Sequence, residues 1–573
     1  MQCGATRRVG LTRRQVMAAA SASALTLTTG TGQAASEPVA SGSVFEDLEG
    51  RGKRGRASRG IAGVMVSNGR DVVKTDSEGR WRLAVTEGDS LFVIKPPHWD
   101  TPLAATSVPQ FSYLYQPRGS AKDIAWRYAG VAETGPLPPS IDFPLVRQRE
   151  SARFEVLLFA DTQPENRVEL GYLRDDIIAG TLGTSAAFGI NHGDVVFDDL
   201  SLYPRYLQLL GATGIPWHHC PGNHDINLEA RDDRSSRETW KRVFGPRHYA
   251  FQYAGATFIL LDNVHYFGDN PGTPGYGAYC GRVGERQLQF VSNVLAHVPR
   301  EHLVVLSMHV PLLTYQDPSD AADNTADRNS LLRLLATRPH TLSFSGHMHL
   351  TEHHYLGDDA TGGSAGSHGH HHHQVLAAAS GGWWGGPRDG RGIPSADSPD
   401  GSPNGYHILA VDDARYTTRF VPATGKTSRQ LRAVVNTPSA RRAAAIRADS
   451  DAHSCAPIPA SELAACQLVV NVFDGGPRTH VSYAIGGRPA RVPMQRQAIC
   501  DPFVAQLFAR SAATQKPWVQ AVPSSHVWTA GLPCDLAMGA HRIEVRAVDE
   551  YGRECVQQLL LEVGPRGTLA QPS

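Results

Sequence analysis

The chain has 573 residues, with 55 basic and 55 acidic side chains and a formal net charge of zero. This length predicts two to four domains, and the balanced charge gives no reason to expect a nucleic-acid or membrane-surface binder. Hydrophobic residues make up 41% of the chain. That is enough for ordinary globular cores, and no run of about 18 apolar residues predicts a transmembrane segment.

The first residues have the order of an export signal. Arg13 and Arg14 precede a mildly apolar run from Met17 to Thr29, and small residues follow near position 35. Basic, apolar and small-residue regions in this order are typical of a bacterial twin-arginine signal. A disordered terminus or an uncleaved anchor is the alternative. We therefore expect residues 1–35 to be a signal peptide and the protein to be periplasmic or extracellular.

The next segment, 40–145, has the pattern of a small β-sandwich. Short β-rich runs alternate with Asn-Gly and Glu-Gly turns between residues 60 and 85, which predicts hairpins. The proline-rich stretch TGPLPPSIDFP follows at residues 134–144. Such a stretch is typical of a linker, so we expect the N-terminal β domain to end near residue 145.

From residue 150 to 372 the pattern changes to α/β layers. Apolar strand-like runs such as FEVLLFA and HLVVLSM alternate with amphipathic stretches such as ERQLQFVSNVLAHV. A Gly- and His-rich insertion follows, and we expect its run His370–His373 to be a loop entering the next strand. Short β-like runs then predict a β-rich C-terminal domain at 375–565.

Polar residues follow five of the strand-like runs in the α/β segment. Asp161, NHGD, PGNHD, His309 and GHMH each come directly after an apolar run. In α/β sheets, ligands bind outside the carboxyl ends of the strands. We therefore expect these carboxylate, amide and imidazole groups to converge on one crevice.

The donor types are those of a site for two divalent cations. Such a pair needs oxygen and nitrogen ligands, with a carboxylate bridging the ions, and it generates hydroxide at neutral pH. The candidate ligands are Asp161, Asp194, Asn223, His309, His347 and His349. One motif alone would be weak, but the ordered set, each member after a strand, favours a dinuclear centre.

The motifs ADTQ, GDVVFDD, GNHD, MHVP and GHMH resemble those of the calcineurin-like metallophosphoesterases over about residues 153–355. The flanking segments resemble the N- and C-terminal modules of one bacterial branch of that family. The resemblance implies an α/β fold with a four-layer αββα metallophosphoesterase core, flanked by two β-sandwich-like domains.

The resemblance also implies roles for the candidate residues. Asp161 and His349 would bind the first metal, and Asp194 would bridge the two metals. The second site would be completed by Asn223, His309 and His347. His224 would hydrogen-bond the phosphoryl oxygen and protonate the leaving alkoxide. Either Asp198 or Asp225 would orient that imidazole, and the sequence leaves the choice open.

Gln163 departs from the Asp-any-His pattern that is commonest in the family. Its carbonyl oxygen can still ligate, but as a harder donor that favours Mn²⁺, Mg²⁺ or Ca²⁺ over iron or zinc. We interpret Gln163 as a retuned metal ligand, with loss of the first metal as the alternative. The metal identity is open among Mn, Fe, Zn, Mg and Ca.

Trp383 and Trp384 lie among glycines, in SGGWWGG. They are candidates for substrate contact at the mouth of the site, or for packing between domains, and the sequence does not decide between the two.

The predicted function is that of an exported metal-dependent phosphoesterase. It would hydrolyse a small phosphomonoester or phosphodiester by attack of hydroxide bound to a dinuclear metal centre, and the export signal leaves room for association with the cell envelope. The alternative is a non-catalytic surface or glycan-binding protein with a degraded phosphoesterase core, which Gln163 and the two β domains would suit.

Overall fold

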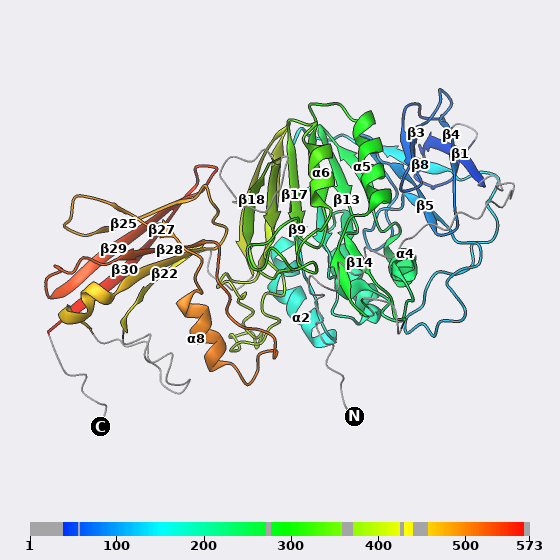
Figure 1. The fold of residues 1–573 in the computed structure, drawn as a ribbon. Helices are drawn as coiled ribbons and strands as arrows, with labels where there is room; N and C mark the ends of the chain where they lie inside the picture. Colours follow the sequence, from blue (N-terminus) through cyan, green and yellow to red (C-terminus); the bar gives the residue numbers. More distant parts are fainter. Residues whose placement is uncertain are drawn as a thin grey trace, which may run out of the picture.

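The computed structural model describes residues 38–55, 58–270, 275, 277–357, 371–423, 429–438 and 457–565. The expected signal peptide, 1–35, lies outside these residues. The described chain forms three parts in a row, with the N-terminal β domain at one end and the C-terminal β domain at the other (Figure 1). None of the described helices combines the length and the apolar character needed to cross a membrane.

The N-terminal domain has two four-stranded sheets. One contains, in spatial order, β4 (Arg80–Ala84), β1 (Val39–Glu46), β8 (Phe143–Arg147) and β6 (Trp99–Asp100). The other contains β3 (Val72–Lys74), β2 (Met65–Ser67), β5 (Asp89–Ile94) and β7 (Ser112–Tyr115). In β4, Trp81 and Leu83 are buried between exposed arginines, which is the alternation of a strand with one face on a core.

The central part contains a five-stranded and a six-stranded sheet. The first has the order β11 (Trp217–Cys220), β10 (Phe188–His192), β9 (Arg153–Phe159), β20 (Gly405–Asp412) and β21 (Arg415–Pro422). The second has the order β12 (Tyr249–Tyr253), β13 (Ala256–Leu260), β16 (Leu303–Ser307), β17 (Thr341–Ser345), β19 (His371–Val375) and β18 (Glu352–Leu356). A small ribbon pairs β14 (Val264–Tyr266) with β15 (Tyr279–Gly281).

Helices cover the outer faces of both sheets. Along β9, Val156 and Leu158 enter the core cluster between the sheets, whereas Leu157 and Phe159 pack into the cluster formed with α2 and α3. The helices are α2 (Arg167–Asp176), α3 (Tyr203–Gly211), α4 (Glu238–Phe244), α5 (Glu285–His297) and α6 (Arg328–Leu335), with short 3-10 turns at Ile178–Thr181, Leu200–Leu202, Asn223–Asp225 and Asp233–Ser235. α5 and α6 flank the six-stranded sheet (Figure 1). The expected four-layer core between two β domains is confirmed.

The C-terminal domain again has two sheets. They have the orders β22 (Leu431–Asn436), β24 (Gln467–Val472), β28 (Val527–Gly531), β27 (Gln495–Arg496), and β23 (Ile458–Pro459), β30 (Glu554–Gly564), β29 (Gly539–Val548), β25 (His480–Ile485), β26 (Val492–Pro493). The domain also contains a 3-10 turn at Ala460–Ala465 and α8 (Pro502–Arg510). α8 lies on the side facing the core (Figure 1).

Part of the segment expected in the C-terminal domain belongs to the core sheets. β20 pairs antiparallel with β9, and β21 extends the same sheet. β20 is an inner strand: Tyr406 and Ile408 face the helix side, and Leu409 and Val411 face the space between the sheets. A short run does not show which sheet it will extend; these two strands, which lie inside the segment 375–565 predicted as a β-rich C-terminal domain, complete a sheet of the core. The described histidines, His371–His373, lie in β19 and not in a loop.

The direction of the strands determines where the site forms. β9, β10 and β11 are mutually parallel, as are β13, β16, β17 and β19. Their carboxyl ends therefore meet along one edge of the two packed sheets. The predicted metal ligands follow these ends, at Asp161, Asp194, Asn223, His309 and His347.

Candidate metal centre

The candidate ligands leave their strands through sharp backbone turns. Asp161, Asp194, His347 and His349 have positive φ values of 48°, 52°, 75° and 55°. Non-glycine residues adopt this left-handed region at an energetic cost, and such positions cluster at functional sites. The turns direct the side chains into the space at the strand ends.

Three glycines allow the ligand loops to approach one another closely. A Cβ on Gly193 would lie 2.4 Å from His309 Nδ1, and one on Gly222 would lie 2.1 Å from Asp194 Oδ1. A Cβ on Gly346 would lie 2.4 Å from Asp161 Oδ2. Each of the motifs GD, GN and GH therefore contains glycine because a neighbouring ligand occupies the place of its side chain.

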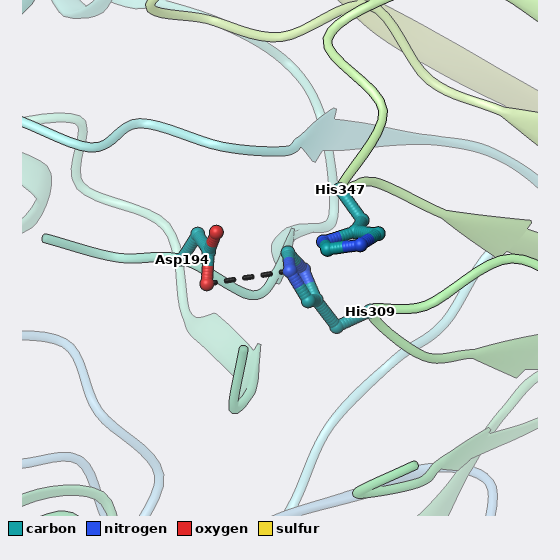
Figure 2. A group of neighbouring side chains, drawn as sticks. All are labelled: Asp194, His309 and His347. Atoms are coloured by element: carbon teal, nitrogen blue, oxygen red, sulfur yellow. Dashed lines mark ion pairs between the residues drawn. The ribbon is translucent and has the colours of Figure 1, made fainter. Parts of the chain in front are cut away.

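Asp194, His309 and His347 form one half of the centre (Figure 2). Each offers one ligand atom, and these atoms lie within 4.8 Å of one another. Asp194 Oδ1 is 3.3 Å from His309 Nε2, which is also 3.0 Å from Asn223 Oδ1. The four residues come from the ends of four different strands, in both sheets of the core.

The tautomer of His309 shows that this half is suited to a cation. His309 Nδ1 lies 2.8 Å from the carbonyl oxygen of His192, so this nitrogen carries the proton of the neutral ring. Nε2 then presents a lone pair to the oxygen acceptors of Asp194 and Asn223. Lone pairs that converge in this way are stabilised by a bound cation or by a proton, and a hydrogen bond at the remote nitrogen is typical of ligating histidines.

Asp161 and His349 lie in the other half. Asp161 is fully buried, both its carboxylate oxygens lie 2.9 Å from the His347 backbone nitrogen, and Oδ1 is 3.6 Å from His349 Nε2. His349 Nδ1 donates to the Gly381 carbonyl oxygen over 2.6 Å. The ring nitrogen that faces Asp161 therefore carries the lone pair in the neutral form.

The acidities reflect two buried carboxylates close together. Burial raises the pKa of Asp161 to about 7, and the charge of Asp194 adds to this rise. Burial would also raise the pKa of Asp194, but His309 and His224 outweigh it and hold that pKa below its usual range. Burial lowers the pKa of His309, yet the charge of Asp194 reverses the shift and raises it to about 9. Divalent cations would compensate this negative charge.

Gln163 does not offer its carbonyl oxygen to the cluster. Its Oε1 accepts a hydrogen bond of 2.6 Å from Trp383 Nε1, while its Nε2 donates to Asp194 Oδ2. A buried indole N–H needs an acceptor, so Trp383 fixes the orientation of the amide. In the structure the amide group links Trp383 to Asp194, and ligation by the Gln163 carbonyl oxygen stays a prediction.

His224 is oriented by Asp198, which decides between the two acids that the sequence left open. His224 Nδ1 lies 2.8 Å from Asp198 Oδ1, and Nε2 is 4.0 Å from Asp194 Oδ2. Nε2 is thus the atom that faces the metal cluster. Phe197 stacks on the imidazole with a centroid distance of 4.3 Å, and this contact restricts rotation of the ring.

Asp225 supports the loop and takes no part in orienting that imidazole. Its Oδ1 accepts from the Tyr203 hydroxyl over 2.9 Å, and its Oδ2 accepts from the backbone of Gly222 and Val195 over 2.8 and 3.2 Å. Burial raises its pKa to about 6, with a further rise from Asp194. These contacts join the GNHD loop to the loop that follows β10.

Three models of one protein family match the chain. The calcineurin-like phosphoesterase model matches residues 154–350. The N-terminal and C-terminal models of calcineurin-like phosphoesterase match residues 48–128 and 373–555. The chain belongs to the calcineurin-like phosphoesterase family. None of the curated proteins with which the chain was compared matches it.

Two solved structures are similar to the chain at low identity. A purple acid phosphatase from yellow lupin (Lupinus luteus) seeds is 14% identical over 67% of each chain, with a TM-score of 0.32. The structure of PhoD is 12% identical over 67% of this chain and 88% of that one, with a TM-score of 0.33. The family assignment is carried by the three family models.

The two tryptophans of the SGGWWGG motif have different surroundings. Trp383 stacks on His349 at a centroid distance of 3.9 Å and donates to Gln163. Trp384 is buried in the hydrophobic cluster of the helix side and lies 6.2 Å from the Tyr172 ring. Trp384 therefore packs in the hydrophobic core. Trp383 is almost completely buried and contacts two residues of the candidate metal centre, His349 and Gln163.

The sequence did not reveal two residues near the candidate metal centre. Asp323 Oδ1 lies 3.1 Å from His347 Nε2, in a loop without a motif. Trp518, in the C-terminal domain, stacks near-parallel on Phe197 at 5.9 Å and meets Trp383 edge-on at 5.9 Å. The sequence around Asp323 contains no motif that predicts its contact with His347. No local pattern around Trp518 predicts that this residue of the C-terminal domain reaches the metal centre.

Proposed function

We propose that this family member is an exported, metal-dependent hydrolase of phosphomonoesters or phosphodiesters. The single observation that carries the proposal is the convergence of Asp194, His309 and His347 within 4.8 Å. Residues of this kind, at the ends of three separate strands, are brought together only by the fold. The family provides the reaction class, and the donor set provides a place for the cations that this class uses.

The residues fit two divalent cations, which when bound supply a water of lowered pKa and neutralise charge on the phosphoryl group. One cation would be held by Asp194, Asn223, His309 and His347. The other would be held by Asp161, His349 and a shared Asp194. Gln163 would act on this second group through its hydrogen bond to Asp194. Its carbonyl oxygen is held by Trp383.

His224 provides the proton for the leaving group. Asp198 accepts from Nδ1–H, so a protonated ring presents Nε2–H to the centre, where a departing alkoxide can take the proton. The negative charge of Asp198 stabilises the protonated imidazole, and Phe197 keeps its plane fixed. Protonation of the leaving group by His224 completes the hydrolysis, and no phosphoenzyme intermediate is formed.

One side of the centre is aromatic, which favours substrates with carbon-rich groups attached to the phosphate. Trp518 is 41% exposed and contacts both Phe197 and Trp383. The segment is held in place by Lys516, whose Nζ is 2.6 Å from Glu165 Oε2. Aromatic faces bind apolar and planar groups well.

A panel of phosphomonoesters and phosphodiesters, assayed with Mn²⁺, Mg²⁺, Ca²⁺, Fe²⁺ and Zn²⁺ in turn, tests the proposal. We expect metal-dependent hydrolysis that Asp194→Asn abolishes and that Asp535→Asn, at an exposed position in the C-terminal domain, leaves unchanged. No hydrolysis with any metal, together with no bound metal, would favour the non-catalytic surface protein instead.

Export is the part of the proposal that rests on the sequence alone. Arg13 and Arg14 with the apolar run behind them support a twin-arginine signal. We expect fractionation of cells to recover the protein outside the cytoplasm. Replacement of both arginines by lysine should retain it inside, and an unchanged distribution would argue against this route.

A further inference from the structure

A second group of metal-binding side chains lies outside the catalytic centre, where the C-terminal domain meets the core. His353 lies on β18 and His372 on the neighbouring β19, while Glu550 lies in the turn between β29 and β30. His353 pairs with Gln374 in the sheet register, so His353 and His372 are diagonal neighbours on one face. One ligand atom from each residue lies within 4.8 Å of the other two.

The separations are those of ligands around a small cation. His353 Nδ1 is 3.0 Å from His372 Nε2 and 3.7 Å from Glu550 Oε1. Tetrahedral bonds of about 2.0–2.1 Å to zinc place two ligand atoms about 3.3 Å apart. The two measured distances bracket this value.

The outer atom of every ligand is fixed by a hydrogen bond. His353 Nε2 lies 3.0 Å from Asp474 Oδ1, so it carries the ring proton and leaves the lone pair on Nδ1. His372 Nδ1 lies 3.0 Å from the Tyr416 hydroxyl, and Glu550 Oε2 accepts from Tyr355. Carboxylate and hydroxyl partners of this kind orient the ligands in protein metal sites.

The charges around the group favour a cation. Both histidines are buried, and the Glu550 side chain is 14% exposed. Asp474 and Glu550 contribute two negative charges, and Arg478, 3.7 Å from Glu550 Oε2 and stacked over Tyr355, contributes one positive charge. His407 Nε2 also lies 3.1 Å from Asp474 Oδ1. If the imidazoles of His353, His372 and His407 are all neutral, one negative charge is left over, and a buried charge requires compensation.

The same turn joins the two core sheets. The Tyr551 hydroxyl lies 3.3 Å from Thr418 Oγ1 on β21, and Tyr355, on β18, donates to Glu550. The turn between β29 and β30 reaches the edge of the core that carries β18 (Figure 1). A cation at this point would hold the C-terminal domain against the edges of both sheets.

We propose that His353 Nδ1, His372 Nε2 and Glu550 Oε1 form a structural site for one divalent cation of the zinc class, separate from the catalytic centre. Two imidazoles and one carboxylate are ligands that zinc accepts readily. Asp474 and the tyrosines 355 and 416 orient the ligands. The site fastens the C-terminal domain to the core and takes no part in hydrolysis.

A purely hydrogen-bonded arrangement is the competing state of the same residues. His372 Nε2–H would donate to His353 Nδ1, and the Tyr416 hydroxyl would donate to His372. Metal content separates the two states, because only the cation site adds an equivalent of metal to the full-length protein.

The experiment compares four full-length proteins after chelation, reloading with Zn²⁺ and dialysis, with metal measured by mass spectrometry. The proteins are the wild type, Glu550→Gln, Asp194→Asn, and His541→Gln as the control at a half-buried histidine of the same domain, outside the proposed site. We expect Glu550→Gln to lose one equivalent relative to the wild type and to keep its phosphoesterase activity. Asp194→Asn should still bind the Glu550-dependent equivalent, which separates this proposal from the proposed function. Equal metal content in the wild type and Glu550→Gln would overturn the proposal.

Thermal unfolding gives an independent measurement in the Asp194→Asn background. Zn²⁺ should raise the Tm of that variant. Adding Glu550→Gln or His372→Gln should remove this rise. Without metal, at least one of the two double variants should keep a Tm close to that of Asp194→Asn alone. A Zn²⁺-induced rise that is unchanged in both double variants would contradict the site.

Discussion

The two halves of the candidate metal centre are built from the same kind of strand-end loop but differ in their ligands and in the side chains that hold them. Around Asp194, His309 and His347, imidazole nitrogens and carboxylate oxygens converge, and Asp194 also accepts from the backbone N–H of His224. Around Asp161 and His349, the amide of Gln163 is held between Trp383 and Asp194. We predict that the first half, with the four candidate ligands Asp194, Asn223, His309 and His347, binds a cation more tightly than the second, which has only Asp161, His349 and the shared Asp194.

The difference shows how one substitution alters a metal centre without disturbing its frame. A histidine in place of Gln163 would bring one more nitrogen ligand, whereas the amide adds a hydrogen bond to the shared carboxylate. The backbone turn is retained, with φ of 33° at Gln163. We predict that Gln163 tunes the metal preference of the centre, and the predictions below test how unequal its halves are.

The largest effect is expected from the residue that belongs to both halves. Asp194→Asn removes the charge that the two cations share, which is worth several kcal/mol and corresponds to a loss in kcat of at least about 1,000-fold. Steady-state hydrolysis with saturating Mn²⁺ measures it. Retention of wild-type kcat would show that Asp194 does not bridge.

Removing the proton donor should have the next largest effect. His224→Asn is expected to lower kcat by about 100- to 1,000-fold, within the range of general acid catalysis, while metal content stays at the wild-type value. Esters whose leaving groups need no protonation should be affected least. An equal loss for good and poor leaving groups would contradict the role of His224.

Metal binding should depend on pH through both halves. Without metal, Asp161 is protonated below about pH 7 and His309 below about pH 9, so protons compete with cations under these values. Apparent affinity should rise by about tenfold per pH unit for each proton released. Calorimetric titration with Mn²⁺ from pH 6 to 9 measures the slope, and a flat profile would refute the competition.

Asp198 and Asp225 should separate catalysis from stability. Asp198→Asn is expected to lower kcat by about tenfold through the orientation of His224, with little change in Tm. Asp225→Asn weakens buried hydrogen bonds to Tyr203, Gly222 and Val195 and should cost about 1–3 kcal/mol of unfolding free energy. The reverse pattern would mean that the orienting acid has been misassigned.

The smallest effect concerns the weaker half itself. Gln163→His should raise the affinity of that half for Zn²⁺ or Fe²⁺, and Trp383→Phe should free the Gln163 carbonyl for a harder cation such as Mn²⁺. Each change is expected to be at most about tenfold, at the low end of the effect of residues that orient ligands. Competition titrations with two metals measure the preference. Unaltered preference in both variants would mean that the amide does not tune the site.

The sequence was sufficient for the ligands that follow strands. The period of the apolar runs locates the strand ends at Asp161, Asp194 and His309, and parallel strands place such ends along one edge. The sequence was insufficient where the orientation of a side chain depends on contacts between segments that are distant in the chain. The orientation of the Gln163 amide depends on Trp383, 220 residues away.

The same limit applies to the fold. Alternating and apolar runs predicted the α/β core and the β domains, but the sheet that β20 would join depends on packing against β9 and not on its own pattern. Trp518 reaches the site from the C-terminal domain, and the choice of Asp198 over Asp225 required the geometry of the His224 ring.

The most direct test of the metal centre is a crystal structure of the protein soaked with Mn²⁺, with anomalous scattering used to locate the ions. We predict the strongest peak among Asp194, Asn223, His309 and His347, and a weaker one beside Asp161 and His349. A hydrolytically active protein with no peak at the first group would contradict the central claim that the strand ends gather these side chains to hold the catalytic cations.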